Sequence, residues 1–147
     1  MAKFTSKIFS GVKNVAQPDD SDADYVPVDI DFPAVNFVVG DIIELIKLPA
    51  GVKFVDWFAV FPDIDTNGTP TFAFSIGLLN PLSTDLATVY SAGHTAGQTN
   101  AIVRNAVADP YLADSTVERR IGLKITAAAA TYAAPTVPGA VFIALRG

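Results

Sequence analysis

From residue 25 onward the chain consists of short stretches of apolar residues separated by turn-forming residues. In residues 26–32 every second residue is apolar, and the residues between them are proline or aspartate. This alternation is typical of a β-strand with one buried face and one solvent-exposed face. Comparable stretches follow at 35–45, 52–61, 72–78, 101–107, 117–125 and 140–145, while residues 86–91 fit a short strand or a short helix. About eight such strands predict an all-β fold, an antiparallel β-sandwich or jelly-roll-like domain.

The N-terminal segment carries an apolar pattern of its own. Phe4, Ile8, Val12 and Val15 recur at the spacing of one helical face, so a short amphipathic helix and an extended arm are both compatible with it. Such a segment cannot bury its apolar face alone and must dock on its own domain or on a neighbour. We expect it to serve assembly more than folding, so that deleting residues 1–20 leaves the melting transition nearly unchanged.

An acidic segment separates this arm from the strands. Residues 17–24 contain one proline, several aspartates and no large apolar residue, a composition typical of a linker. We therefore interpret residues 1–24 as an N-terminal arm with an acidic linker, and residues 25–147 as the β-sandwich domain. The total length suits one domain of this kind.

The apolar content is high for the number of charges. Half of the residues are hydrophobic, 17% are charged, and the mean hydropathy is +0.38. Either some apolar surface meets a partner, or a well-filled core is combined with a surface of short side chains. Residues 52–61 are apolar on both faces except for Lys53 and Asp56. We expect this strand to be covered by a second sheet on one side and by the arm or a partner subunit on the other.

Composition also argues against several classes of function. The formal net charge is −5, and without a basic stripe we expect no nucleic-acid partner. The absence of cysteine excludes disulfides and cysteine-ligated metals. We also expect no secretory signal and no membrane span, because no apolar run approaches the ~18 residues that a span needs. No glycine-rich phosphate loop follows a strand, so no cofactor is expected.

A single histidine is the main candidate for catalysis. His94 lies in a glycine-containing stretch, with Ser91 and Asp85 nearby in sequence. A catalytic triad needs a nucleophile, a base and an orienting carboxylate in one geometry, which closeness in sequence does not provide. The glycine-x-serine-x-glycine motif is absent as well. We therefore expect His94 to be a surface-loop histidine and the protein not to be an enzyme.

Two groups of acidic residues suggest possible chemistry. The Asp63–Gly68 loop places oxygen-bearing residues at every second position, as in the start of a calcium loop, but Phe74 stands where the closing glutamate would fall. A tight turn uses the same residues, and we favour a turn without a metal. Asp29 and Asp31 share the polar face of an expected edge strand, where charges discourage stray strand pairing.

Arginine and tryptophan side chains are common at protein interfaces. Arg119 and Arg120 are adjacent, so on a strand they point to opposite faces. One of them can lie inward beside Asp56 or Glu44, or cross an interface. Trp57 belongs to an aromatic-rich stretch whose first interpretation is core, and it becomes an interface anchor if it faces away from the second sheet.

One longer run of sequence suggests a family. Residues 39–52 combine a Gly-Asp pair, alternating apolar residues and a Leu-Pro-Ala-Gly turn. A loop with Asp63-Ile64-Asp65 follows, then a strand over 74–78, and later a charged strand over 120–125 before the alanine- and proline-rich end. This pattern resembles bacteriophage head decoration (cement) proteins over roughly residues 25–147. Ser75 departs from it, because that family often has an acidic residue there.

The resemblance implies a structural virion protein on the exterior of the capsid, made in the host cytoplasm. Such a protein binds the major capsid protein and itself, with a homotrimer favoured over a dimer, and stabilises the shell. The alternatives are another virion component, such as a tail or head-fibre subunit, or a carbohydrate- or cation-binding β-sandwich. The residues expected at an interface with the capsid or another subunit are Phe4, Ile8, Phe9, Val12, Trp57 and Arg119.

Overall fold

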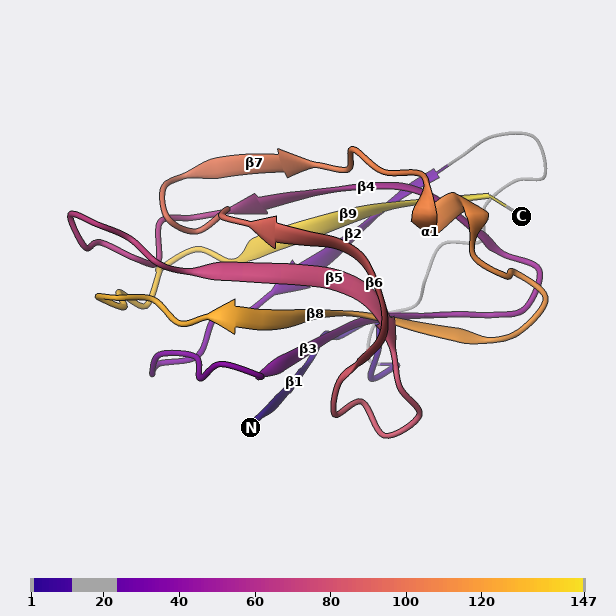
Figure 1. Cartoon of the computed structure of the whole chain (residues 1–147), viewed down its shortest axis with the longest axis horizontal. Helices are drawn as coiled ribbons and strands as arrows, with labels where there is room; N and C mark the ends of the chain where they lie inside the picture. The colour runs from indigo at the N-terminus through magenta and orange to yellow at the C-terminus, as the bar shows by residue number, and fades with distance from the viewer. Residues whose placement is uncertain (1, 12–23, 147) are drawn as a thin grey trace.

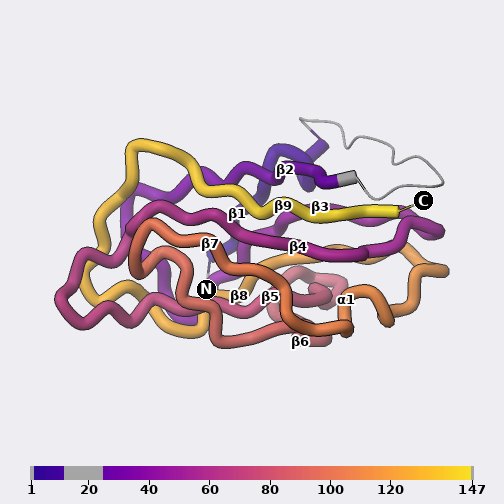
Figure 2. The backbone as a smooth tube through the Cα atoms, turned by 90° about the horizontal axis from the view of Figure 1, so that it is seen from above, coloured from indigo at the N-terminus to yellow at the C-terminus, as the bar shows by residue number. Residues whose placement is uncertain are grey.

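The computed structural model describes residues 2–11 and 24–146, in which nine strands form two sheets. The five-stranded sheet has the order β1 (Lys3–Thr5), β3 (Ile42–Leu48), β8 (Arg119–Ala127), β5 (Ala73–Leu79) and β6 (Leu86–His94). The four-stranded sheet has the order β2 (Asp24–Ile30), β9 (Gly139–Arg146), β4 (Lys53–Phe61) and β7 (Ala101–Arg104). The sheets lie in two layers (Figures 1 and 2), so the predicted β-sandwich is confirmed.

The chain passes from one sheet to the other at every connection between described strands except the one from β5 to β6. Strands distant in sequence therefore lie side by side, as β2 and β9 do along seven residue pairs. All neighbouring strands run antiparallel except β1 and β3, which are parallel. The predicted antiparallel arrangement thus holds for the eight strands from β2 to β9.

The core fills the space between the two sheets, and the period-two pattern explains which residues enter it. In β2 the alternate residues Val26, Val28 and Ile30 are buried. The inward residues of the central strands are buried in the same way: Ile121, Leu123 and Ile125 in β8, and Val141, Ile143 and Leu145 in β9. Pro27 is accommodated because β2 is an edge strand of its sheet.

The boundaries differ from the sequence predictions at several points. Residues 35–39 form a loop, because Asp41 uses its carboxylate to accept the Val38 N–H at 2.8 Å and the Ala2 N–H at 2.7 Å. Residues 86–94 form a strand rather than a helix. A four-residue helix α1 (Asp109–Leu112) follows β7, and the alanine-rich segment after β8 is a loop, as predicted.

The described part of the N-terminal arm belongs to the sandwich. Its β1 pairs with β3, and the Ser6 N–H continues the ladder by donating to the Glu44 carbonyl at 2.9 Å. Phe4 packs edge-on against Phe37, with ring centroids 5.2 Å apart. The helical alternative is therefore wrong for residues 3–5, and the extended one is right. Val12 and most of the acidic linker lie outside the described residues.

Two further arm residues are almost completely covered. Ile8 joins the main core, and Phe9 packs on Ile42 and Leu79, which lie on the outer face of the five-stranded sheet. The Ser6 side chain is buried as well, donating to the Leu45 carbonyl and accepting the Phe9 N–H. The burial of Ile8 and Phe9 argues against the expectation that the arm contributes little to folding, because these side chains are part of the folded domain.

Candidate functional site

The loop between β4 and β5 is organised around the carboxylate of Asp65, which is 1% exposed. Its Oδ2 accepts the backbone N–H groups of Thr71 at 2.7 Å, of Phe72 at 3.0 Å and of Ala130 at 3.0 Å. Its Oδ1 accepts the N–H of Thr131 at 3.0 Å. One side chain therefore joins the loop after β4 to the alanine-rich loop after β8.

The surroundings of Asp65 stabilise the charged form of its carboxylate. Burial raises the pKa of this carboxyl, but the backbone N–H groups of Thr131, Thr71, Ala130 and Phe72 outweigh burial and hold the pKa well below 3.8. Both carboxylate oxygens of Asp65 are occupied by these donors. The described residues also contain no cluster of three or more acidic or histidine side chains that could hold a metal ion. Asp63, Asp65 and Asn67 each accept the backbone N–H two residues further along, as the turn interpretation expects.

His94 lies at the end of β6 and not in a surface loop, so that expectation is wrong. Its Nε2 is 2.7 Å from the Ser91 Oγ, and its ring packs edge-on against Trp57 at a centroid distance of 4.9 Å. Burial lowers the pKa of His94, which keeps the ring neutral at pH 7. Among the hydrogen bonds of the described residues none joins His94 to a carboxylate, so a serine and a histidine meet here without the third member of a triad.

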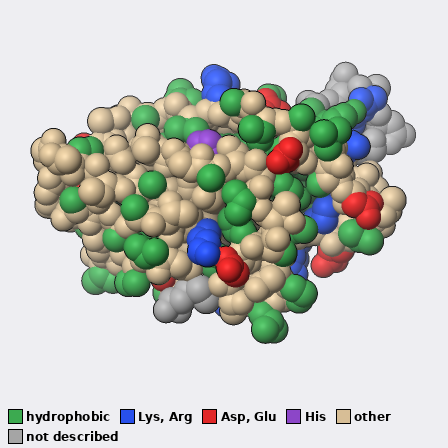
Figure 3. Space-filling view, viewed as in Figure 1, with side chains coloured by type: hydrophobic (Ala, Val, Ile, Leu, Met, Phe, Trp, Pro, Cys, Tyr) green, Lys and Arg blue, Asp and Glu red, His purple; other side chains and the backbone are tan. Residues whose placement is uncertain are grey.

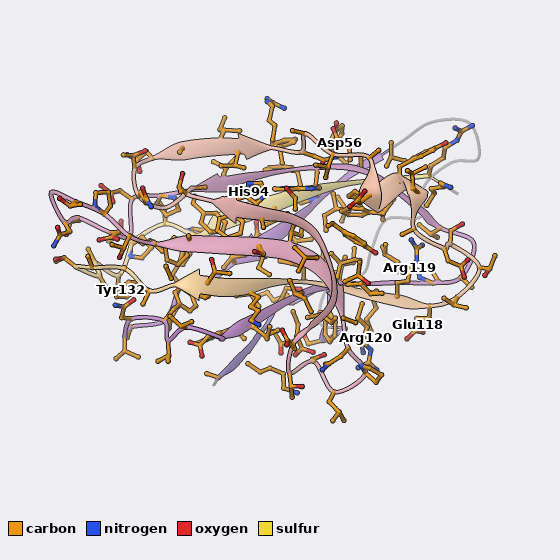
Figure 4. The ribbon with its side chains drawn as sticks, in the orientation of Figure 1. Asp56, His94, Glu118, Arg119, Arg120 and Tyr132 are labelled. Carbon is orange, nitrogen blue, oxygen red and sulfur yellow. The ribbon has the colours of Figure 1, made fainter. Side chains whose placement is uncertain are left out.

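Arg119 and Arg120 point to opposite faces of β8, as predicted. Arg119 is buried and donates through Nη2 to the Val52 carbonyl, whereas the Arg120 Nη1 donates to the Pro81 carbonyl at 3.0 Å on the outside. Arg119 does not meet Asp56, and the two labelled side chains lie well apart in Figure 4. Glu44 accepts the Thr5 hydroxyl instead. Both suggested carboxylate partners of Arg119 are therefore wrong.

The guanidinium of Arg119 is held inside the domain beside Tyr90. Burial lowers the pKa of Arg119, while Tyr90 and Asp114 oppose that shift. Within the described part of the chain, Nε and Nη1 of Arg119 and the Tyr90 hydroxyl find no hydrogen-bond partner. This arginine contributes to the inner packing of the sandwich end near α1 (Figure 4).

The other predicted interface residues also have roles inside the chain. Trp57 is fully buried in the main core, as the first interpretation expected. Phe4, Ile8 and Phe9 pack on their own domain, as described above. An interface role for these residues stays a prediction, and the structure does not bring the five described ones (Phe4, Ile8, Phe9, Trp57 and Arg119) together in one patch.

Asp29 and Asp31 are exposed near the free edge of β2. They line a hollow of about 270 Å³ between β1 and β2, together with Lys3 and Lys7. Their environment is polar and open to solvent, which agrees with a role in keeping the sheet edge solvated. The geometry provides no desolvated carboxyl pair for acid–base chemistry.

Most of the outer face of the five-stranded sheet is either covered by Phe9 of the arm or carries polar side chains. Phe9 covers Ile42 and Leu79, and Lys124 forms an ion pair with Asp85 at 2.7 Å on the same face. Gly77 and Gly122 are paired across β5 and β8, and a Cβ on Gly77 would lie 2.1 Å from the Thr88 carbonyl oxygen. In the space-filling view, apolar side chains are scattered among polar and backbone atoms (Figure 3).

The outer face of the four-stranded sheet is more apolar, and none of its residues is among the interface residues expected from the sequence. Phe58 on β4 stacks on Phe142 of β9 with ring centroids 4.6 Å apart, and Tyr25 of β2 lies 5.6 Å from Phe58. Arg104 of β7 covers the other side of Phe58, with its Cζ 5.0 Å from the ring centroid. The signal for this face was the stretch 52–61, which is apolar on both sides.

Comparison with known proteins gives matches among solved structures alone. No protein-family model matches the sequence, and the search of curated proteins found no match. A chain in the capsid of Ralstonia phage GP4 has the same fold, with a TM-score of 0.82 and 27% identity over 99% of this chain and 98% of that chain. A chain in the cyanophage Pam1 capsid asymmetric unit matches with a TM-score of 0.55 and 20% identity over 90% of each chain, which shows a shared fold.

The fold and these comparisons define a class: a two-sheet β-sandwich whose structural neighbours are chains of phage capsids. Within the described residues, no helix is long and apolar enough to cross a membrane.

Proposed function

We propose that this chain is a phage capsid decoration protein that binds the outer surface of the head and stabilises the shell. The observation that carries the proposal is the match to a chain of the Ralstonia phage GP4 capsid over nearly the whole of both chains. A structural match over the entire domain, between chains of similar length, favours a shared role in a virion over a fold reused for another purpose. The major capsid protein is then the main partner.

The strand order supports a capsid component. Strands β2 to β9 form the sets β2-β9-β4-β7 and β3-β8-β5-β6, and the chain crosses between the two sheets at nearly every connection. This is the order expected of a jelly roll, an architecture used repeatedly in viral capsids. The strand β1 adds to the second set in parallel and ties the N-terminal arm to it.

The side chains that suggested other functions have structural roles. The oxygens of Asp65 are occupied by backbone donors, and the Ser91–His94 pair lacks an orienting carboxylate among the described residues. A structural and non-enzymatic role therefore agrees better with the chemistry of these side chains than a cation-binding module or a hydrolase does.

Several features favour decoration over building the shell itself. The described arm folds back on its own domain, and the core is closed within one chain. Such a unit can fold before it meets a particle and then attach to a finished exterior. Many weak contacts repeated over a symmetric shell give high avidity without one tight site, more so if the chain binds as a trimer.

The test uses particles assembled without this protein. We expect these particles to form closed shells of normal size, to bind the added purified chain saturably on the outside, and to release DNA at a higher temperature once decorated. Negative-stain microscopy, co-sedimentation and a DNA-binding dye measure the three properties. If closed shells do not form without the protein, it is a shell subunit. If closed shells form but do not bind it, the decoration proposal is wrong.

A further inference from the structure

We infer that the outer face of the four-stranded sheet is the contact surface between copies of this chain, with β7 of one copy next to β2 of its neighbour. We call this surface the β2–β7 face; its outward residues include Tyr25, Asp29, Phe58, Ile102, Arg104 and Phe142. The inference rests on the self-association that the proposed function includes and names the surface responsible for it.

The strand register places these side chains in rows across the sheet. Phe58 pairs with Phe142 on one side and with Arg104 on the other. Val60 pairs in the same way with Ala140 and with Ile102, which is 57% exposed. Alternate residues of a strand share a face, so both rows point away from the core.

The apolar surface continues beyond the strands. Val60 and Ile102 border a hollow of about 350 Å³ that is also lined by Val137 and Pro138. Val137 is exposed, as is Tyr25 at the opposite edge of the face. An apolar surface with aromatic rings and an arginine has the composition of the centre of a protein interface.

The described arm does not cover this face. The stretch 52–61 is apolar on both sides. The sequence predicts that the side facing away from the second sheet is covered by the arm or by a partner subunit. Residues 2–11 lie on the other sheet, with β1 against β3 and Phe9 on Ile42. The described part of the arm therefore leaves this face uncovered, and a partner subunit is the other cover that the sequence suggests.

The distribution of charge indicates that this partner is a second copy. Arg104 is exposed on β7 at one edge of the face, and Asp29 is exposed on β2 at the other. Within the described part of the chain, the one ion pair is Lys124 with Asp85, so neither Arg104 nor Asp29 has an ionic partner of its own. When β7 of one copy lies next to β2 of another, the Arg104 of the first copy comes near the Asp29 of the second.

The first experiment compares two glutamate substitutions on matched edge strands. Ile102→Glu places a charge in the β2–β7 face, whereas Val89→Glu does so on β6 of the other sheet, where Val89 is 49% exposed. Sedimentation velocity at about 1–100 µM measures association. We expect the wild type and Val89→Glu to be oligomers, and Ile102→Glu to dissociate at least ~100-fold more readily with an unchanged circular dichroism spectrum.

A second experiment tests the arrangement of the two copies. Arg104→Asp and Asp29→Arg should each weaken association about tenfold, and the double variant should recover to within about threefold of the wild type. A double variant that is no tighter than the weaker single variant would overturn the β7-to-β2 arrangement.

Other outcomes of the first experiment would overturn the inference or assign the face to a different partner. A monomeric wild type at all concentrations, or an Ile102→Glu variant that associates like the wild type, overturns the inference. If the wild type is monomeric and Ile102→Glu loses binding to particles, the face belongs to the shell contact instead. Both measurements in solution are made without particles, so failure of self-association and failure of capsid binding are distinguished.

Discussion

Replacing Asp65 with asparagine is expected to lower the free energy of unfolding by about 3–5 kcal/mol at pH 7. The carboxylate accepts N–H groups from both loops that it joins, and hydrogen bonds to a charged acceptor are the stronger kind. An asparagine amide has one acceptor oxygen, and its NH₂ group would face backbone donors. Urea denaturation followed by tryptophan fluorescence measures the loss.

The same side chain predicts how stability depends on pH. The pKa of Asp65 in the folded protein lies well below its ordinary value of 3.8, because the backbone donors outweigh burial. A depressed folded-state pKa contributes stability that is fully present above the unfolded-state pKa and is lost as the pH falls toward the folded-state value. We therefore expect the wild type to lose stability between about pH 5 and pH 2, and Asp65→Asn to lose less over the same range.

Asp63→Asn is the matched control for both measurements. Asp63 lies two residues away in the same loop and accepts one backbone hydrogen bond, from Asp65 at 3.1 Å, which an amide oxygen can replace. Its substitution should cost less than about 1 kcal/mol and leave the pH profile unchanged. A loss at Asp65→Asn no larger than at Asp63→Asn would show that the carboxylate does not organise these loops.

Removing residues 2–11 is expected to lower the melting temperature by about 10–20 °C. The deletion removes β1 and the buried side chains of Ile8 and Phe9, and it exposes Ile42 and Leu79 on the outer face of the five-stranded sheet. Differential scanning calorimetry on the truncated and full chains gives the difference. The truncated domain can be refolded and compared at the same concentration, so that any effect of association is held constant.

Two point variants locate the origin of that loss. Phe9→Ala removes a side chain that is almost fully buried and should cost about 2–4 kcal/mol, whereas Lys7→Ala changes an exposed residue and should cost less than about 0.5 kcal/mol. If the truncated chain melts within 2–3 °C of the full chain, the arm is an independent assembly element, and its packing on the sandwich contributes little.

The sandwich could be predicted from the sequence, but the position of the arm could not. Alternation of apolar and polar residues is a local property, so the strands β2, β5 and β8 were anticipated from their own residues. β1 has three residues and no alternating run long enough to identify it. Its place is fixed by β3, which follows it by nearly forty residues in sequence, and no local sequence pattern indicates a pairing over that distance.

The candidate sites, too, could be predicted only as far as local sequence patterns reach. A turn at residues 63–68 was predicted from its Asp, Asn and Gly content, but the donors to Asp65 come from two separate loops. The opposite directions of Arg119 and Arg120 followed from strand geometry, whereas the choice of Arg119 as the inward one and its partner Val52 did not. The β2–β7 face was indicated through the stretch 52–61 alone, because Tyr25, Arg104 and Phe142 come from three other strands.

The copy number of this protein in purified virus particles tests the central claim most directly. Quantitative mass spectrometry against the major shell protein gives the ratio of the two chains. A ratio of one to one, or of one to a small integer, is predicted for a decoration protein that covers the shell. A few copies per particle, as for a tail or head-fibre subunit, or complete absence from particles would contradict the account.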